Sequence, residues 1–468
     1  MEALDLARWQ FGITTVYHFL FVPLTIGLAG VVAAMEAAWI RTGNDTWLRA
    51  TKFWGKLLLI NFAIGVVTGI VLEFQFGMNW SSYSRFVGDV FGAPLAMEAL
   101  LAFFMESTFL GLWIFGWNRL PRWLHNACMW AVAVGTLLSA YFILAANSWM
   151  QHPVGYEIED GKGRLTDIWA VLTNSKQLVT FPHTIAGAFV TAGVFLIAIS
   201  CWHMLRKQHT DVMRSSLKVG LWVTAVASIA VAVSGDLQAK VVTDQQPMKM
   251  AAAEALYETE RPASFSLFTI GTLDGDEELL SIRVPRVLSY LATGDFDGEV
   301  QGIDDLQAQY EAEYGEGDYS PNIPVVYWSF RLMMGAGIAI LAVSVVGLWL
   351  TRRGRTPHRR WVWWIGLAAL PLPFIANSTG WLMAEMGRQP WTVFGVLRTS
   401  DSVSPTVGVG TVATSLITLT VLYGALAVVE VWLLLKYIKI GPPTSEEVRA
   451  ELEPPAADED RPEPSLVY

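Results

Sequence analysis

The apolar runs of this sequence restrict its possible folds more than any other feature. Each run is about 20 residues or longer, which as a helix is enough to cross the roughly 30 Å hydrocarbon core of a bilayer. Lipid offers no partner to backbone N–H and C=O groups, so a helix is the structure expected for each run. We therefore predict an all-α integral membrane protein with nine transmembrane helices, and the 53% hydrophobic composition agrees with this class. The runs lie at residues 12–40, 52–76, 93–117, 123–147, 182–205, 217–235, 324–351, 361–384 and 408–437.

Basic residues gather in alternate connections between these runs, and connections rich in Lys and Arg face the cytoplasm. This pattern predicts an external N-terminus, a cytoplasmic C-terminus and an external connection between the sixth and seventh helices. The basic positions are Arg41, Arg49, Lys52, Lys56, Arg119, Arg122, Arg206, Lys207, Arg214, Lys218 and the run RRGRTPHRR at 352–360.

Acidic residues concentrate in the long external connection and in the C-terminal tail, although the net charge of the whole chain is only −10. An acidic surface excludes nucleic acid, whose phosphates need a basic face. In the external connection we predict a helix after Pro247 and loose order in its later part; the Pro- and acid-rich tail is predicted to be disordered. The four predicted segments are helices one to six at 1–235, the external loop at 236–323, helices seven to nine at 324–440 and the tail at 441–468.

A carboxylate and a guanidinium lie at the end of the eighth apolar run, in the stretch GWLMAEMGRQPW at residues 380–391. Glu385 is costly at that depth unless it is solvated, paired or bound to a metal. Arg388 follows within one turn. These residues either cap the helix at the interface or belong to a cofactor site.

The third run contains two carboxylates, Glu98 and Glu106. In a regular α-helix they lie about 80° apart and about 12 Å along the axis, so they share a broad face at different depths. This spacing suits a proton relay across part of the membrane. The alternative is structural, because paired carboxylates also lock helices together through hydrogen bonds.

Five potential iron ligands fall in the predicted outer half of the bilayer, although a single His or Met is commonly a structural residue. Small residues after His183 would let a flat macrocycle approach the backbone, and His, Met and carboxylate side chains are ordinary axial ligands of haem. The arrangement indicates more than one haem. The five residues are His18, Glu98, His183, Met333 and Glu385.

Long motifs of the sequence resemble subunit I of cytochrome bd-type quinol oxidases, and the resemblance covers essentially every predicted span. They are HFLFVPLTIG, TKFWGKLLLINFAIGVVTG, EFQFGMNWSSYSRFVGDVFGAPLAMEALLAFFMEST and GWLMAEMGRQPW. The external loop resembles that of the short-loop branch of the family. The resemblance implies a terminal oxidase of the bacterial cell membrane that oxidises quinol at the outer face and reduces oxygen to water with cytoplasmic protons. Such an enzyme generates proton motive force without a pump.

The resemblance also implies the cofactors: a low-spin haem b (b558-type), a high-spin haem b (b595-type) and haem d. His183 and Met333 would be the axial pair of the low-spin haem. His18 and Glu385 would be proximal ligands of the two high-spin haems, with Glu98 beside them; the resemblance leaves open which haem occupies which site.

Further roles follow from the same resemblance. Trp381 would lie between macrocycles. Arg331, Arg388 and Arg8 would pair with haem propionates. Lys249 and Glu254 match the quinol-site residues of the family, and a Glu can take the hydroxyl proton of ubiquinol or menaquinol; the structural alternative is a surface pair.

Glu106, Glu98 and Ser139 would carry protons inward. The implied partners are a second large subunit (subunit II), a small single-span accessory subunit and membrane lipid. Two alternatives from other classes are a secondary transporter with an intramembrane carboxylate relay and a haem-bearing quinol dehydrogenase without oxygen chemistry.

Overall fold

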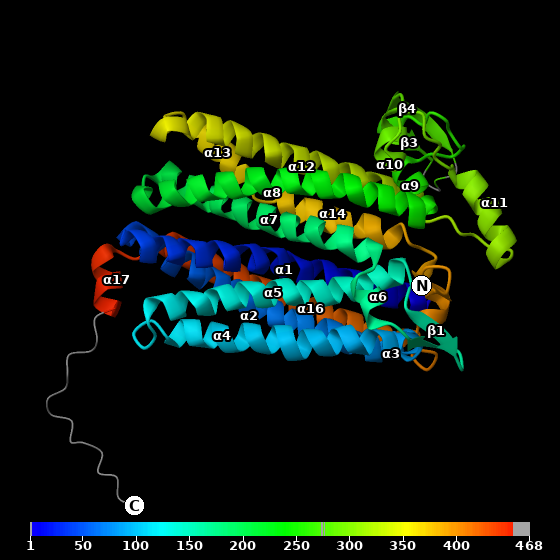
Figure 1. The fold of residues 1–468 in the computed structure, drawn as a ribbon, viewed down its shortest axis with the longest axis horizontal. Helices are drawn as coiled ribbons and strands as arrows, with labels where there is room; N and C mark the ends of the chain where they lie inside the picture. Colours follow the sequence, from blue (N-terminus) through cyan, green and yellow to red (C-terminus); the bar gives the residue numbers. More distant parts are fainter. Residues whose placement is uncertain (1, 273–274, 276, 453–468) are drawn as a thin grey trace, which may run out of the picture.

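The membrane part of the chain is a bundle of long helices (Figure 1). A computed structural model describes residues 2–272, 275 and 277–452. Within these ranges nine helical segments are long and apolar enough to span a membrane, which confirms the predicted number. They are Ala3–Thr42, Asp45–Met78, Ser81–Phe115, Arg122–Gln151, Ile168–Arg206, Thr210–Gln245, Ile323–Gly354, Arg360–Met386 and Val409–Ile440.

Several spans are longer than their apolar runs because polar turns extend them beyond the lipid. The sixth helix, for example, continues ten residues past the predicted boundary at 235. The helices of the bundle are α1 (Ala3–Thr42), α2 (Asp45–Met78), α3 (Ser81–Met97), α4 (Phe104–Phe115), α5 (Arg122–Gln151), α6 (Ile168–Leu172), α7 (Ser175–Arg206), α8 (Thr210–Gln245), α12 (Ile323–Thr351), α13 (Arg360–Ala368), α14 (Leu372–Met386) and α16 (Val409–Ile440).

The α-helix is interrupted within several spans. The fifth is divided into α6 and α7. The third contains a π-helical turn, η1 (Glu98–Phe103), between α3 and α4, and the eighth is broken into α13 and α14 around Pro371. A π-turn is wider than an α-turn and is frequent at functional sites. The angle of about 80° between Glu98 and Glu106, which assumed a regular α-helix, therefore does not describe this span.

The helices pack closely where small residues meet, as is common in membranes. A Cβ on Gly27 of α1 would lie 2.5 Å from the Ala188 carbonyl oxygen of α7. A Cβ on Gly193 of α7 would lie 2.3 Å from Thr224 Oγ1 of α8. These contacts bring α1, α7 and α8 together, and α1 and α7 carry the predicted ligands His18 and His183.

The external segment forms a layer over the end of the bundle where the N-terminus also lies (Figure 1). Its elements are α9 (Pro247–Glu254), the antiparallel pair β3 (Phe265–Gly271) and β4 (Glu278–Val284), α10 (Val287–Thr293) and α11 (Ile303–Tyr314). The predicted helix after Pro247 is confirmed. A second hairpin, β1 (Tyr156–Glu159) with β2 (Lys162–Leu165), and the short elements β5 (Trp391–Val393), β6 (Leu397–Arg398) and α15 (Thr399–Ser402) lie in other connections.

The prediction of loose order in the later part of the external loop is wrong. Helix α11 occupies much of it, because Ile303, Leu306 and Tyr310 recur at helical spacing and are buried on one face. They pack with Tyr319 and Trp391 in one apolar cluster.

The prediction of a disordered tail is wrong for its first part, and residues 453–468 lie outside the described residues. Helix α17 (Ser445–Leu452) packs at the opposite end of the bundle from the external layer (Figure 1). Val448 is fully buried against Trp39 and Leu48. Arg449 forms an ion pair of 2.5 Å with Asp45. The apolar contact and the ion pair stabilise a segment whose composition alone indicates disorder.

Candidate functional site

His18 on α1 presents one ring nitrogen for ligation. Its Nδ1 lies 2.8 Å from the Thr68 hydroxyl oxygen of α2. That hydroxyl donates its own hydrogen to the Ile64 carbonyl at 3.0 Å, so it accepts from the His18 ring and fixes the proton on Nδ1. The unprotonated Nε2 is then free to bind a metal.

His183 on α7 is held in the same way. Its Nδ1 lies 3.3 Å from the Ser234 hydroxyl oxygen of α8, and Ser234 donates to the Ala230 carbonyl at 2.7 Å. The second nitrogen of His183 is therefore also the unprotonated one. Two histidines far apart in the sequence are thus each held by a hydroxyl group, and both have the tautomer that suits iron binding.

Glycines leave space beside each of these candidate ligands. A Cβ on Gly69 would lie 3.2 Å from His18 Cε1, and a Cβ on Gly235 would lie 3.3 Å from His183 Cε1. On α14, a Cβ on Gly380 would lie 3.0 Å from the sulfur of Met333. A flat macrocycle needs such close approach to the backbone.

Trp381 follows this last glycine and packs edge-on against Phe19, with ring centroids 5.2 Å apart. It therefore lies next to the His18 region of α1. Arg8, by contrast, is exposed on the first turns of α1, and no ion pair joins it to any other described residue. No ion pair within the described chain therefore supports the predicted role of Arg8.

Glu385 at the end of α14 is already engaged by protein groups. Asn147 of α5 donates to its Oε1 at 2.9 Å, and Arg388 forms an ion pair with its Oε2. Arg388 also donates to the Thr392 carbonyl at 2.7 Å, while its Nε has no hydrogen-bond partner within the described part of the chain. Glu385 and Arg388 thus form a paired, mostly buried unit.

Buried cations outnumber carboxylates around this unit. Lys176 at the start of α7 is 4% exposed, Lys249 on α9 is 1% exposed and Arg388 is 6% exposed. Burial lowers the pKa of Lys249 well below its ordinary value, and the neighbouring Lys176 and Arg388 lower it further. Glu385 is the carboxylate that opposes them. Basic groups buried this close together either lose a proton or bind an anion, and haem propionates are anions of the required kind.

Lys249 and Glu254, the predicted quinol-site pair, point to different partners. Lys249 Nζ donates to Gln151 Oε1 at 2.9 Å. Glu254 accepts from Arg331 at 2.8 Å and from the Ser266 backbone N–H at 3.0 Å. The two side chains flank the junction between the bundle and the external layer, and no hydrogen bond or ion pair joins them among the residues described.

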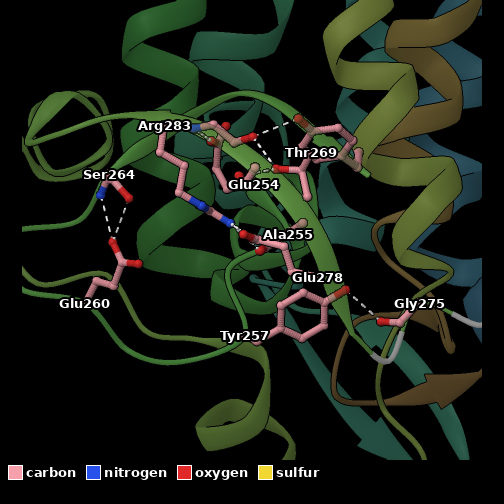
Figure 2. Close-up of polar contacts among 12 residues, drawn as sticks. Glu254, Ala255, Tyr257, Glu260, Ser264, Thr269, Gly275, Glu278 and Arg283 are labelled. Carbon is pink, nitrogen blue, oxygen red and sulfur yellow. Dashed lines mark hydrogen bonds and ion pairs between the residues drawn. The ribbon is translucent and has the colours of Figure 1, made fainter. Parts of the chain in front are cut away.

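The carboxyl of Glu254 lies in the polar interior of the external layer. Figure 2 shows it near Arg283, which donates to the Ala255 carbonyl at 2.8 Å. Burial raises the pKa of Glu254, and the charge of Arg331 and the Ser266 N–H oppose that shift. Two further nitrogens of Arg331, Nε and Nη1, are buried without a partner within the described ranges. This unit combines a proton acceptor with unused donors.

The carboxylates of the third span lie along one side of α5. Ser139 of α5 donates to Glu98 Oε1 at 2.8 Å, so two of the predicted proton carriers are in direct contact. Glu106 lies deeper, with its Cγ 2.6 Å from where a Cβ on Gly135 would be, and its Oε1 has no hydrogen-bond partner among the described residues. Glu98 also interacts electrostatically with Glu73 of α2.

Sequence reasoning missed Lys176 and Glu73. Glu73 could have been found by the criterion that selected Glu98, because it is a carboxylate at the edge of an apolar run. Lys176 carries no such signal, since an isolated Lys before a span is typical of any membrane interface.

These residues fit haem. The described residues contain no group of three or more His, Cys, Asp or Glu side chains that could hold a metal ion. Haem iron takes four ligands from the macrocycle and needs only one or two from the protein. Two fixed histidines, a methionine beside a glycine and a buried excess of cations suit that demand.

Comparison with known proteins assigns the family. The family model described as cytochrome bd terminal oxidase subunit I matches residues 6–442. The chain belongs to that family. It is therefore a haem-binding subunit of a respiratory terminal oxidase, and a multi-pass protein of the bacterial membrane. The predicted resemblance and fold class are confirmed, and neither the transporter nor the dehydrogenase alternative holds.

Individual relatives of the cytochrome bd family agree. The chain is 48% identical to the cytochrome bd ubiquinol oxidase subunit 1 of Bacillus subtilis, with 94% of each chain covered. It is 39% identical to the cytochrome bd-II ubiquinol oxidase subunit 1 of Escherichia coli, over 94% of this chain and 97% of the relative. The solved bd oxidase of Geobacillus thermodenitrificans contains a chain with a TM-score of 0.86 and 27% identity, over 94% of this chain and 99% of the other.

Proposed function

We propose that this chain is the catalytic subunit of a quinol oxidase that takes electrons from quinol at the external layer and delivers them to oxygen within the membrane. Relatives named ubiquinol oxidase subunit 1 support quinol as the substrate. The observation that carries the proposal is the matched environment of His18 and His183, each with its Nδ1 held by a hydroxyl. The proposed substrate class includes ubiquinol and menaquinol.

Three haems are proposed: a low-spin haem b held by His183 and Met333, and a high-spin haem b and a haem d with His18 and Glu385 as proximal ligands. When bound, haem iron accepts and passes on single electrons and reduces oxygen. Lys176, Arg388 and Arg331 would hold the propionates. Each carboxylate oxygen of Glu385 accepts from one neighbour, Asn147 or Arg388, and retains a second lone pair for iron.

Quinol oxidation is proposed at the junction where Glu254 meets Arg331. A carboxyl whose pKa is raised by burial is a better proton acceptor than an exposed one, so Glu254 takes a hydroxyl proton as quinol loses its electrons. The unused nitrogens of Arg331 are available to a quinol oxygen or a propionate. Lys249 has a positioning role: it holds the Gln151 side chain by a hydrogen bond and interacts electrostatically with Glu385.

The protons used at the oxygen-reducing haems are proposed to move from the cytoplasm into the membrane through Glu106, Glu98 and Ser139. The contact between Ser139 and Glu98 and the free oxygen of Glu106 support this order. Quinol protons leave on the outside, whereas protons for water come from the cytoplasm. Each turnover therefore moves charge across the membrane and generates proton motive force without a pump.

The name subunit 1 of the relatives implies further subunits. We propose that these are a second large subunit and a small single-span accessory subunit, in contact with the lipid-facing helices of this chain. The segment at 236–323 is proposed as the quinol-binding loop of the short-loop type.

The assignment of the low-spin haem is tested by Met333→Leu beside the matched neighbour Met334→Leu. We expect Met333→Leu and His183→Ala to remove or convert the low-spin band in reduced-minus-oxidised spectra of the purified complex, because six-coordinate iron needs both side chains. Met334→Leu should leave the spectrum unchanged. Normal low-spin bands in both ligand variants would overturn the assignment.

A further inference from the structure

A cationic cavity of about 380 Å³ lies at the end of the bundle opposite the external layer. It is formed where α7 and α8 meet the end of α12 and the start of α13. Two cations of α8 and three from the turn after α12 line it: Arg214, Lys218, Arg352, Arg353 and Arg355. Asp and Glu are absent from its lining. The catalytic assignments above use none of these residues.

The cavity cations have no acidic partners, unlike other cations at the same end of the bundle. Within the described residues, no ion pair involves any of the five. Outside the cavity, Lys52 pairs with Glu451 at 2.8 Å and Arg49 pairs with Asp211. Asp211 is the acid closest in sequence to Arg214, and Arg49 already engages it. The cavity therefore retains its positive charge.

The backbone turn that places these arginines is strained. Arg353 has a φ of 53°, which is unusual for a residue with a side chain. Gly354 follows with a φ of 75°, and a Cβ there would lie 3.6 Å from Arg214 Nη2, so the turn folds back over α8. Strain of this kind, of order 1–3 kcal/mol, persists where the surroundings enforce it. The rule that cytoplasmic connections are basic explains the charges but not this closed arrangement.

The interior of the cavity is apolar. Leu217, Leu348 and Trp363 line it beneath the cations, and Trp222 lies one turn deeper than Lys218 on the lipid-facing side, where it is 55% exposed. A cationic rim above an apolar, lipid-accessible wall matches a molecule with an anionic head and hydrocarbon chains. A soluble anion would use only the rim.

We propose that this cavity binds the phosphodiester headgroup of an anionic phospholipid, with an acyl chain along Trp222. Basic pockets between helices at the cytoplasmic side are suited to such headgroups. The arginines and Lys218 neutralise the phosphate, and the aromatic and aliphatic side chains cover the first carbons of the chain. The site is separate from the proposed quinol and haem sites, and the proposal does not depend on them.

The test uses the purified, intact oxidase complex, stripped of lipid and titrated with dioleoylphosphatidylglycerol or dioleoylphosphatidylcholine, with retained lipid counted by native mass spectrometry. The cavity variant is Arg214→Gln with Arg353→Gly, in which glycine also relieves the strained φ. A cation that lines the cavity beside the headgroup should contribute about fivefold in affinity, so the loss of two should weaken phosphatidylglycerol binding by about 30-fold. Haem absorbance checks that the variant is folded.

The matched control is Arg359→Gln with Arg360→Gln, which removes two charges from the same connection without touching the cavity. It should retain the parent affinity. The proposal is overturned if both lipids bind equally, if the control loses as much affinity as the cavity variant, or if millimolar inorganic phosphate displaces phosphatidylglycerol. The last outcome would identify a soluble anion as the occupant.

Discussion

Replacing Glu254 with Gln should separate the chemistry of quinol oxidation from the stability of the external layer. The amide has the same shape and still accepts a hydrogen bond, but it cannot take a proton at ordinary pH. Loss of a positioned general base typically costs 10²–10⁴ in rate. We therefore expect quinol-driven oxygen uptake to fall by about that factor, while an artificial donor that bypasses the site still drives uptake.

The same change leaves Arg331 without its carboxylate. Arg331 is mostly buried, its Nε and Nη1 already lack partners in the described chain, and its guanidinium lies over the rings of Phe265 and Tyr327 at 4.7 and 4.6 Å. Leaving one member of a buried pair uncompensated costs about 3–5 kcal/mol. Hydrogen exchange around Ser266, whose N–H donates to Glu254, should accelerate accordingly.

A second variant distinguishes the two effects. Glu254→Gln combined with Arg331→Met removes the unpaired charge and places a flexible apolar side chain against the same rings. Protection around Ser266 should return, but quinol oxidation should not. Recovery of the quinol-driven rate in the double variant, or a rate within threefold of the parent in Glu254→Gln alone, would refute the role of Glu254 as the base.

The pH profile gives an independent check of the same carboxyl. Because burial raises the pKa of Glu254, the folded chain holds this proton at pH values where the unfolded chain has released it. Above its folded pKa the Glu254 carboxyl is ionised, pairs with Arg331 and can act as the base. The parent rate should rise with pH over that range, and Glu254→Gln should lack this rise.

Two further changes test other parts of the structure. Glu106→Gln should lower steady-state oxygen consumption about 100-fold or more, because the amide cannot carry protons to the haems. Reduction of the low-spin haem by quinol, measured by stopped flow, should stay fast. Near-normal turnover with a normal membrane potential would show that protons bypass Glu106. Leu306→Ala, at a fully buried position of α11, should destabilise the external layer by about 2–5 kcal/mol, measured by hydrogen exchange of α11. The exposed Gln309→Ala on the same helix is its control, and equal exchange in both variants would contradict the packing described for α11.

The sequence predicts the membrane part well because a helix is the structure that satisfies the backbone hydrogen bonds of each apolar run in lipid. The candidate ligands His18, His183 and Met333 could be selected because ionisable or metal-binding groups at one depth are unusual in such runs. The two histidine tautomers could not be predicted. They depend on Thr68 and Ser234, which approach only when the helices pack.

The features that the sequence did not reveal depend on tertiary packing. In the sequence, Lys176 resembles any interfacial Lys. In the folded chain it is buried at the start of α7, below the external layer. The π-turn begins at Glu98, where the third span contacts Ser139 of α5. Lys249 and Glu254 share one short helix, so their motif suggests a common site, but their side chains diverge to Gln151 and Arg331. Spacing along a chain does not specify these directions.

Helix α17 has a consequence for how the chain is made. It packs on α1 and α2, the first two spans to be synthesised, although it emerges after all nine spans. Lys52 of α2 donates to Glu451 of α17 at 2.8 Å, and the backbone carbonyl of Pro443 accepts from Arg49 at 2.7 Å. The first hairpin therefore stays incomplete during insertion and is closed only by the end of the described chain. A chain that stops before Ser445 would contain all nine described spans but would lack the contacts of α17 with Trp39, Leu48 and Asp45.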